Sequence, residues 1–275
     1  LLGGSNLERP EGNVGCGLPE SKLPEVQSAE IKSADLVVPF VENAGQVPDG
    51  TVKYLAAIFR GVAYVKEQGV SYALLGKSSE AAEPLNSFVQ AMEQRNKPQV
   101  AQSVSVFEVE YQTNSEGNDS KQTIALNPKG ARESKTSVSD YRGVKQGQWK
   151  AGLKAYEGIS LGELWPKVEV ELRAHEQNVE QLFFVKSGGR AEDISLSFKG
   201  VQELATDERG ELVIHHEGGV FSFTKPVAFQ EDSAGERKEV AVAYVLRNER
   251  EVGFQVGPYD ETKTLVIDPL LASTY

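Results

Sequence analysis

Cysteine, methionine and histidine are scarce in this sequence. Its 275 residues include one cysteine, one methionine and three histidines, so no disulfide can form within the chain. The lone Cys16 cannot supply a thiolate metal site or a redox pair. Because the residues before Cys16 are polar where a signal peptide would be apolar, we do not expect it to carry a lipid anchor.

Long apolar runs and an excess of positive charge are also missing. No apolar run approaches the roughly 18 residues of a membrane-spanning helix, so we expect no membrane span. Lys+Arg 29 against Asp+Glu 40 gives a net charge of −11, which repels phosphates, and we expect no nucleic-acid partner. With 39% hydrophobic residues and a mean hydropathy of −0.37, the composition is typical of a globular protein with a sizeable core.

Helical periodicity is rare along the chain. The best apolar stripe runs from Ala81 to Arg95 and predicts one short helix near 81–95. A second helical turn is predicted at Ser160–Leu164, where Pro166 would end it.

Short runs rich in β-branched and aromatic residues dominate instead. Alternation is clearest in 103–111 and 168–172, and the nearly continuous apolar run 239–246 is typical of a central strand covered on both faces. The predicted fold is all-β, a large antiparallel β-sandwich that could consist of two similar halves. We expect strands at 51–59, 62–66, 70–75, 103–111, 122–127, 167–173, 179–185, 193–198, 211–216, 219–223, 238–246, 251–256 and 263–267.

The sequence predicts a long arm followed by one large domain. Residues 1–36 have scattered prolines and glycines without a sustained period, as an extended or partly disordered arm would. The expected domain covers 37–270, with 37–150 and 151–270 as its candidate halves, and 271–275 would begin a linker to a downstream region. The halves rest on an internal similarity between Phe59-Arg60-Gly61-Val62 and Phe198-Lys199-Gly200-Val201.

An ordered series of short motifs runs through the predicted domain. It includes Phe40-Val41-Glu42-Asn43-Ala44-Gly45-Gln46, Leu164-Trp165-Pro166, Phe198-Lys199-Gly200, Val256-Gly257-Pro258-Tyr259-Asp260 and Leu265-Val266-Ile267-Asp268-Pro269. In order and spacing, the series resembles an uncharacterised β-rich domain found N-terminal to SBBP-type β-propeller repeats in bacterial secreted and cell-surface proteins. This resemblance implies a β architecture and an extracellular or cell-surface location, after removal of a signal that this chain does not contain. It implies no catalytic residues.

Six residues are candidates for ligand contact or for holding turns. Asn43 and Gln46 could read a glycan through their amides, but they more simply satisfy backbone groups in a tight turn. Tyr259 and Asp260 most simply hold a turn. Asp268, which precedes a proline, most simply holds a closing strand. Trp149 and Trp165 could line a sugar-stacking groove, although aromatic residues in a β-rich chain usually fill the core.

Groups that could carry catalysis do not converge in the sequence. His215 and His216 are adjacent on a predicted strand and would point to opposite faces, and His175 is distant, so we expect no metal site. The pairs Glu108 with Glu110 and Glu169 with Glu171 could serve glycoside hydrolysis, but the same alternation is typical of a solvated strand face. We expect no cofactor.

These observations favour a non-catalytic structural or adhesive module that scaffolds downstream repeats and presents loops to protein partners. Two alternatives remain at this point. One is a carbohydrate-binding module or a glycan-active enzyme. The other is a subunit of an extracellular fibre or surface assembly, in which residues 1–36 would add a strand to a neighbouring sheet.

Overall fold

The computed structural model describes seven stretches of the chain: 37–75, 104–113, 121–135, 138–140, 150–176, 178–232 and 235–272. Within them the chain is almost entirely β-strand, with one 3-10 turn, η2 (Ala191–Asp193). The prediction of an all-β, antiparallel fold is therefore confirmed. The helix expected near 81–95, the arm 1–36 and Trp149 lie outside the described residues.

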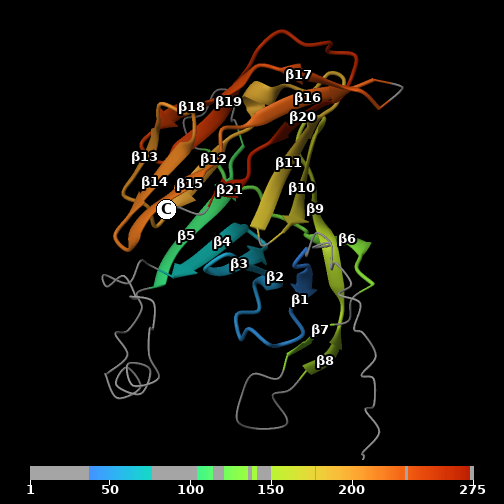
Figure 1. Ribbon diagram of the computed structural model, residues 1–275, viewed down its shortest axis with the longest axis vertical. Helices are drawn as coiled ribbons and strands as arrows, with labels where there is room; N and C mark the ends of the chain where they lie inside the picture. Colours follow the sequence, from blue (N-terminus) through green and yellow to red (C-terminus); the bar gives the residue numbers. More distant parts are fainter. Residues whose placement is uncertain are drawn as a thin grey trace, which may run out of the picture. The chain divides into compact units, whose positions relative to one another are not determined.

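One large antiparallel sheet contains most of the strands (Figure 1). It has 15 strands in the described part of the chain. In pairing order they are β17 (Arg237–Val240), β16 (Val227–Glu231), β20 (Leu265–Asp268), β11 (Asn178–Val185), β10 (Val168–His175), β9 (Ala155–Trp165), β1 (Phe40–Glu42), β2 (Val52–Ile58), β3 (Gly61–Lys66), β4 (Gly69–Leu75), β5 (Val104–Tyr111), β12 (Leu196–Lys199), β19 (Glu251–Val256) and β18 (Val242–Asn248), with β6 (Lys129–Glu133) paired to β9.

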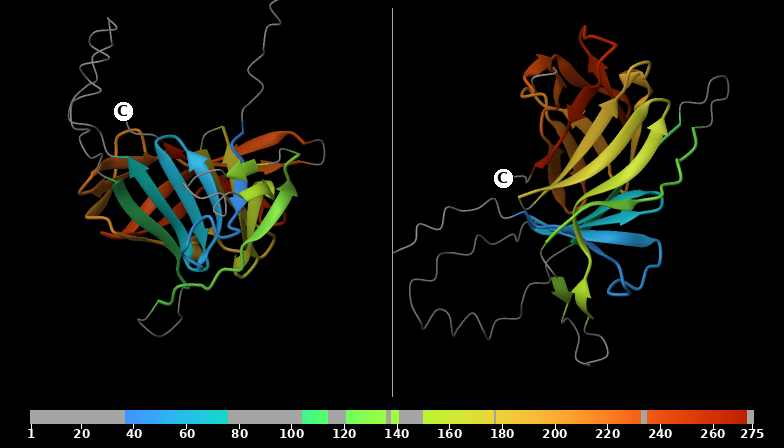
Figure 2. Two further views of the ribbon diagram at one scale, coloured as in Figure 1. Left: turned by 90° about the horizontal axis from the view of Figure 1, so that it is seen from below. Right: turned by 90° about the vertical axis from the view of Figure 1, so that its right-hand side faces the viewer.

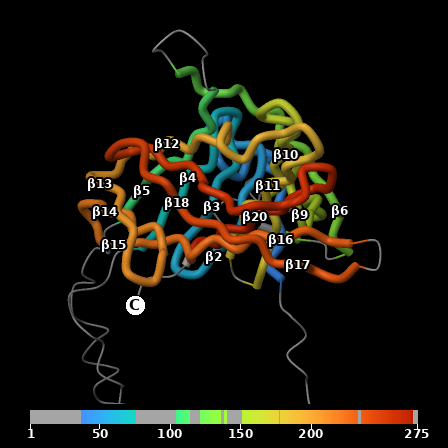
Figure 3. Tube along the Cα trace, turned by 90° about the horizontal axis from the view of Figure 1, so that it is seen from above, coloured from blue at the N-terminus to red at the C-terminus, as the bar shows by residue number. Residues whose placement is uncertain are grey.

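The two ends of this pairing order are consecutive in the sequence. Strands β17 and β18 are separated only by Ala241, so the series of paired strands returns to its own start and the sheet is nearly closed, like a barrel. Seen from below, strands β2, β3 and β4 lie in front of the C-terminal strands, which are drawn in orange and red. Seen from above, the C-terminal strands lie in front (Figures 2 and 3).

The expectation of one doubly covered strand over 238–246 is wrong. The chain breaks its pairing at Ala241, where the strand passes from its partner β16 to its partner β19. Val245 and Leu246, which we expected to be buried, are each 38% exposed. The apolar run therefore belongs to a strand that changes partners, and consecutive residues of its second half are partly exposed to solvent.

A smaller sheet packs beside the large one. It has four strands in the order β13 (Glu203–Thr206), β14 (Leu212–His216), β15 (Gly219–Phe223) and β21 (Leu271–Ala272). Leu271 and Ala272, which we expected to begin a linker, instead pair with β15. A third, two-stranded sheet joins β7 (Val138–Asp140) to β8 (Lys150–Leu153).

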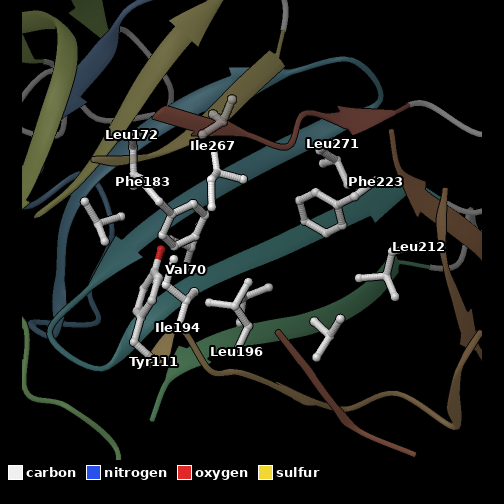
Figure 4. Close-up of a cluster of buried hydrophobic side chains, with 14 of the residues drawn as sticks. Val70, Tyr111, Leu172, Phe183, Ile194, Leu196, Leu212, Phe223, Ile267 and Leu271 are labelled. Carbon is white, nitrogen blue, oxygen red and sulfur yellow. The ribbon is translucent and has the colours of Figure 1, made fainter. Parts of the chain in front are cut away.

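The core is one continuous cluster of apolar side chains from both larger sheets. Alternation along β10 buries Val168, Val170 and Leu172 and turns the intervening glutamates outward. Leu212, Phe223 and Leu271 of the small sheet meet side chains of the large sheet in this cluster (Figure 4). Side chains therefore fill the space that the curled sheet encloses.

Two further local expectations are wrong. The helical turn expected at Ser160–Leu164 is part of strand β9, which pairs with β10 through a bulge, and Gly162 supplies a positive φ of 84° there. The strand expected at 122–127 is reduced to an isolated bridge between Gln112 and Thr123. In both places, pairing to a neighbouring strand overrides the local sequence pattern.

Strand pairs cross the boundary between the two candidate halves. Strand β1 pairs with β9 and β5 pairs with β12. The internal similarity is not reproduced in the structure, because Phe59 lies 51% exposed in a turn whereas Phe198 is 1% exposed inside β12. Residues of both candidate halves belong to the same core.

Candidate functional site

A groove crosses the outer face of five adjacent strands, β10, β11, β20, β16 and β17, which run side by side in Figure 1. Its volume is about 470 Å³, within the range of small-molecule sites. Its lining is Arg173, Leu182, Phe184, Phe229, Glu231, Arg237, Lys263, Thr264, Val266 and Asp268. It lies on the side of the sheet opposite the core.

Strand alternation places an apolar floor in this groove. Phe183 and Ile267 are paired partners that point into the core, so their neighbours Phe184 and Val266 face outward as the next pair. Phe229 pairs with Val266 and extends the floor across β16. The outward face of these strands therefore has apolar residues where solvated strands usually have polar ones.

Arg237 is held in place over this floor. Its guanidinium carbon lies 4.2 Å from the centroid of the Phe229 ring, a cation–π contact. Its Nε donates to Glu231 Oε1 at 2.9 Å. Within the described residues no partner is found for its two terminal nitrogens, so the planar group presents donors to the groove in a fixed orientation.

Asp268 lies at the end of β20, beside the cations of the groove. Its Oδ1 is buried and accepts no hydrogen bond from any described residue. Burial, followed by the charge of Glu180, raises the pKa of this carboxyl from 3.8 to about 6. The charges of Arg173, His175 and Arg237 act in the opposite direction. Asp268 thus contributes to the lining of the groove, while its unpartnered Oδ1 is enclosed by the protein.

Asn43 and Gln46 lie in the loop between β1 and β2. The Asn43 amide donates to the carbonyls of Val47 and Val52 at 3.1 and 3.0 Å, and its Oδ1 accepts from the amides of Gly45 and Val47. The Gln46 side chain likewise bonds to backbone groups within the same loop. Both amide groups therefore hold their own loop. Asn43 also borders a small polar pocket of about 170 Å³.

Tyr259 and Asp260 lie in the turn before β20. Asp260 Oδ1 accepts from the amide and hydroxyl of Thr262 at 3.0 and 2.6 Å, and these bonds lower the pKa of its carboxyl. Gln230 bonds to the Asp260 backbone in both directions. Tyr259 packs against the core, and burial raises its pKa. This turn positions Lys263 at the groove, but neither Tyr259 nor Asp260 lines it.

Trp165 lies in the core, not on a binding surface. It is 4% exposed, and its Nε1 donates to the carbonyl of Gln112 at 2.8 Å. Its ring packs against Tyr111 and Phe183. The structure therefore does not place Trp165 in a sugar-stacking groove.

Two buried glutamates lie on neighbouring parts of the sheet, each with close partners. Glu110 is 4% exposed and accepts from Lys199 at 2.6 Å and from Thr123 at 2.9 Å. This burial contradicts the expectation that Glu110 belongs to a solvated face. Glu110 and the second buried glutamate, Glu251, are each paired with Ser197 of β12. Their side chains therefore lie on the same face of the sheet, on the two strands that flank β12.

The second of these glutamates, Glu251, is 7% exposed. Burial alone would raise its pKa, but hydrogen bonds from Lys121 and Ser195, together with the charges of Lys121 and Arg247, hold the pKa below its usual 4.5. An acid with a lowered pKa keeps its negative charge at neutral pH, so Glu251 is unsuited to donate a proton in glycoside hydrolysis.

The histidines lie apart from one another. His215 and His216 occupy adjacent positions of β14, and His216 Nδ1 accepts from the amide of Gly218 at 2.9 Å. His175 Nδ1 lies 2.9 Å from Glu180 Oε1. Among the residues that the structure describes, no group of three or more potential ligands could hold a metal ion. In the same residues no helix is long and apolar enough to cross a membrane.

Reasoning from the sequence missed the groove. Its residues come from five strands that are distant in the chain, and their proximity depends on the pairing of β20 between β11 and β16. One local signal was present: aromatic residues stand at consecutive positions in Phe183-Phe184, so one of the two must face away from the core.

Comparison with known proteins identifies a family. Residues 40–270 match the family described as "Domain of unknown function (DUF7948)". No curated protein and no solved structure matches the chain. The family match spans the strands from β1 to β20 and all the residues that line the groove.

Proposed function

The chain belongs to this family of domains of unknown function, and we propose that it is a non-catalytic structural module of a bacterial secreted or cell-surface protein. In this role it positions neighbouring parts of the protein and presents its surface to partners. The observation that carries the proposal is the return of the large sheet to its own start at Ala241, around one continuous core.

A sheet of this kind suits a rigid support. Strands β17 and β18 are the two ends of the strand order, paired with β16 and β19 and joined through Ala241, so moving them apart requires breaking their pairs with β16 or β19. The small sheet adds further apolar packing, since Phe223 contacts Tyr72 and Phe198 edge to face. Local movement of one strand therefore disturbs the packing of many others.

The arrangement of the acidic groups also supports a non-catalytic role. The buried glutamates Glu110 and Glu251 are hydrogen-bonded and paired with cations. Asp268 has a raised pKa, but catalysis of glycoside hydrolysis requires a second carboxyl at a suitable distance. The other acid that lines the groove, Glu231, is bonded to Arg237, and Glu180, whose charge acts on Asp268, lies 2.9 Å from His175 Nδ1.

The location at the cell exterior rests on the resemblance to domains that precede SBBP-type repeats, and the net charge of −11 is compatible with a solvated surface. Antibodies against the domain, applied to intact and to lysed cells of the source organism, test this part. We expect labelling of intact cells, and labelling only after lysis would contradict it.

A hydrolysis screen tests the non-catalytic role. The purified chain is incubated with panels of glycans and peptides, and products are measured by mass spectrometry. We expect no turnover above that of an Asp268→Ala, Glu251→Ala double variant. Turnover by the wild-type chain that either single substitution abolishes, with the fold retained by circular dichroism, would overturn the proposal.

A further inference from the structure

From the outer groove on β10, β11, β20, β16 and β17 we infer a binding site for an acidic saccharide, one whose sugar ring bears a carboxylate. The ring would lie on the apolar floor, and its carboxylate would bind the cations that line the groove. This inference does not depend on the structural role proposed above, because a scaffold can exist with or without a ligand on its outer face.

The charge of the groove favours an anion. Its lining contains three cations, Arg173, Arg237 and Lys263, against two acids, Glu231 and Asp268. This local excess stands out in a chain whose net charge is −11. Since Arg237 is fixed by Phe229 and Glu231, its terminal nitrogens are oriented in advance for a planar carboxylate.

The size and floor of the groove favour a ring over a simple carboxylate. At about 470 Å³ the groove is much larger than acetate requires. Phe184 and Val266 are partly exposed on its floor, and the C–H face of a sugar ring packs on such a surface. An extended peptide would instead seek an unpaired strand edge, whereas β11, β20 and β16 are paired on both sides.

Titration calorimetry with the full chain tests the inference, with trigalacturonate as the probe. We expect saturable binding that weakens at least tenfold when the carboxylates are methyl-esterified, because esterification removes the charge and keeps the ring. Acetate in a hundredfold excess should compete weakly. Equal affinity for the charged and esterified sugars, or no binding of either, would overturn the inference, as would binding of an acidic peptide in place of the sugar.

Three variants locate the site. Arg237→Gln should weaken binding at least tenfold and Lys263→Gln at least threefold, since Lys263 is exposed and its loss does not disturb the packing. Arg209→Gln, in the turn between β13 and β14, is the matched control and should bind like the wild type. If Arg237→Gln fails to fold, Lys263→Gln decides. If a folded variant bound the probe as tightly as the wild type does, the ligand would lie elsewhere and the proposed site would be wrong.

Discussion

Replacing Asp268 by asparagine should stabilise the protein at neutral pH. The carboxyl is destabilised by burial and by Glu180, and its pKa rises from 3.8 to about 6. A difference of about 2 pH units corresponds to about 3 kcal/mol at about 1.4 kcal/mol per unit. Because the side chain is partly exposed, solvent screens this interaction, and we expect Asp268→Asn to gain about half, about 1.5 kcal/mol.

The gain should depend on pH with a definite sign. A carboxyl with a raised pKa in the folded state binds its proton more tightly when folded, so its destabilising effect begins as the pH rises past the unfolded-state pKa of 3.8 and is complete above the folded-state pKa of about 6. The advantage of Asp268→Asn should therefore be full above pH 7, decline between pH 6 and pH 4, and vanish below pH 4. The attraction of Arg173, His175 and Arg237 for the carboxylate is already included in its pKa of about 6.

Urea unfolding of both proteins at several values between pH 4 and pH 8 measures this difference. Asp260→Asn is the matched control: hydrogen bonds from Thr262 lower the pKa of Asp260, so this substitution should not stabilise the protein at any pH. A variant Asp268→Asn that is less stable than the wild type at pH 7.5, or whose advantage is the same at pH 4, would refute the reasoning.

Three further substitutions test other parts of the structure by urea unfolding. Glu251→Gln should cost about 1–2 kcal/mol at pH 7 by weakening charge-assisted hydrogen bonds. The cost should shrink as the pH falls through the lowered pKa of the wild-type carboxyl, and a cost that does not change with pH would contradict this. Gly69→Ala should cost about 2 kcal/mol or more, because an added Cβ would overlap the Val109 carbonyl, whereas Gly50→Ala meets no atom within 4 Å and should cost little. Trp165→Phe should cost about 2 kcal/mol of stability, because it leaves the Gln112 carbonyl unpaired and removes packing. An unchanged stability would argue against the core position of this side chain.

The sequence was sufficient to predict the elements that depend on period two. In β10, valine alternates with glutamate within the strand itself, so the sequence alone indicates which face is buried. The structure buries that face, as expected. Strands β3, β4, β14, β15 and β19 lie within a few residues of their predicted ranges for the same reason. An all-β fold follows from such runs without any knowledge of their partners.

Features that depend on strand order could not be predicted in this way. The apolar run around Ala241 is typical of a buried central strand, but the strand changes partners there and part of it is exposed. A helical turn is expected at Ser160–Leu164, yet pairing with β10 makes this segment part of a strand. Asp268 was expected to hold a closing strand, and the structure leaves its buried Oδ1 without a described partner.

Differential scanning calorimetry of the chain tests most directly the claim that the described residues form one rigid unit. Because strand pairs and a single core join the candidate halves 37–150 and 151–270, we expect one unfolding transition whose calorimetric enthalpy equals its van't Hoff enthalpy. Two separate transitions, or independent folding of either half when it is expressed alone, would contradict the claim.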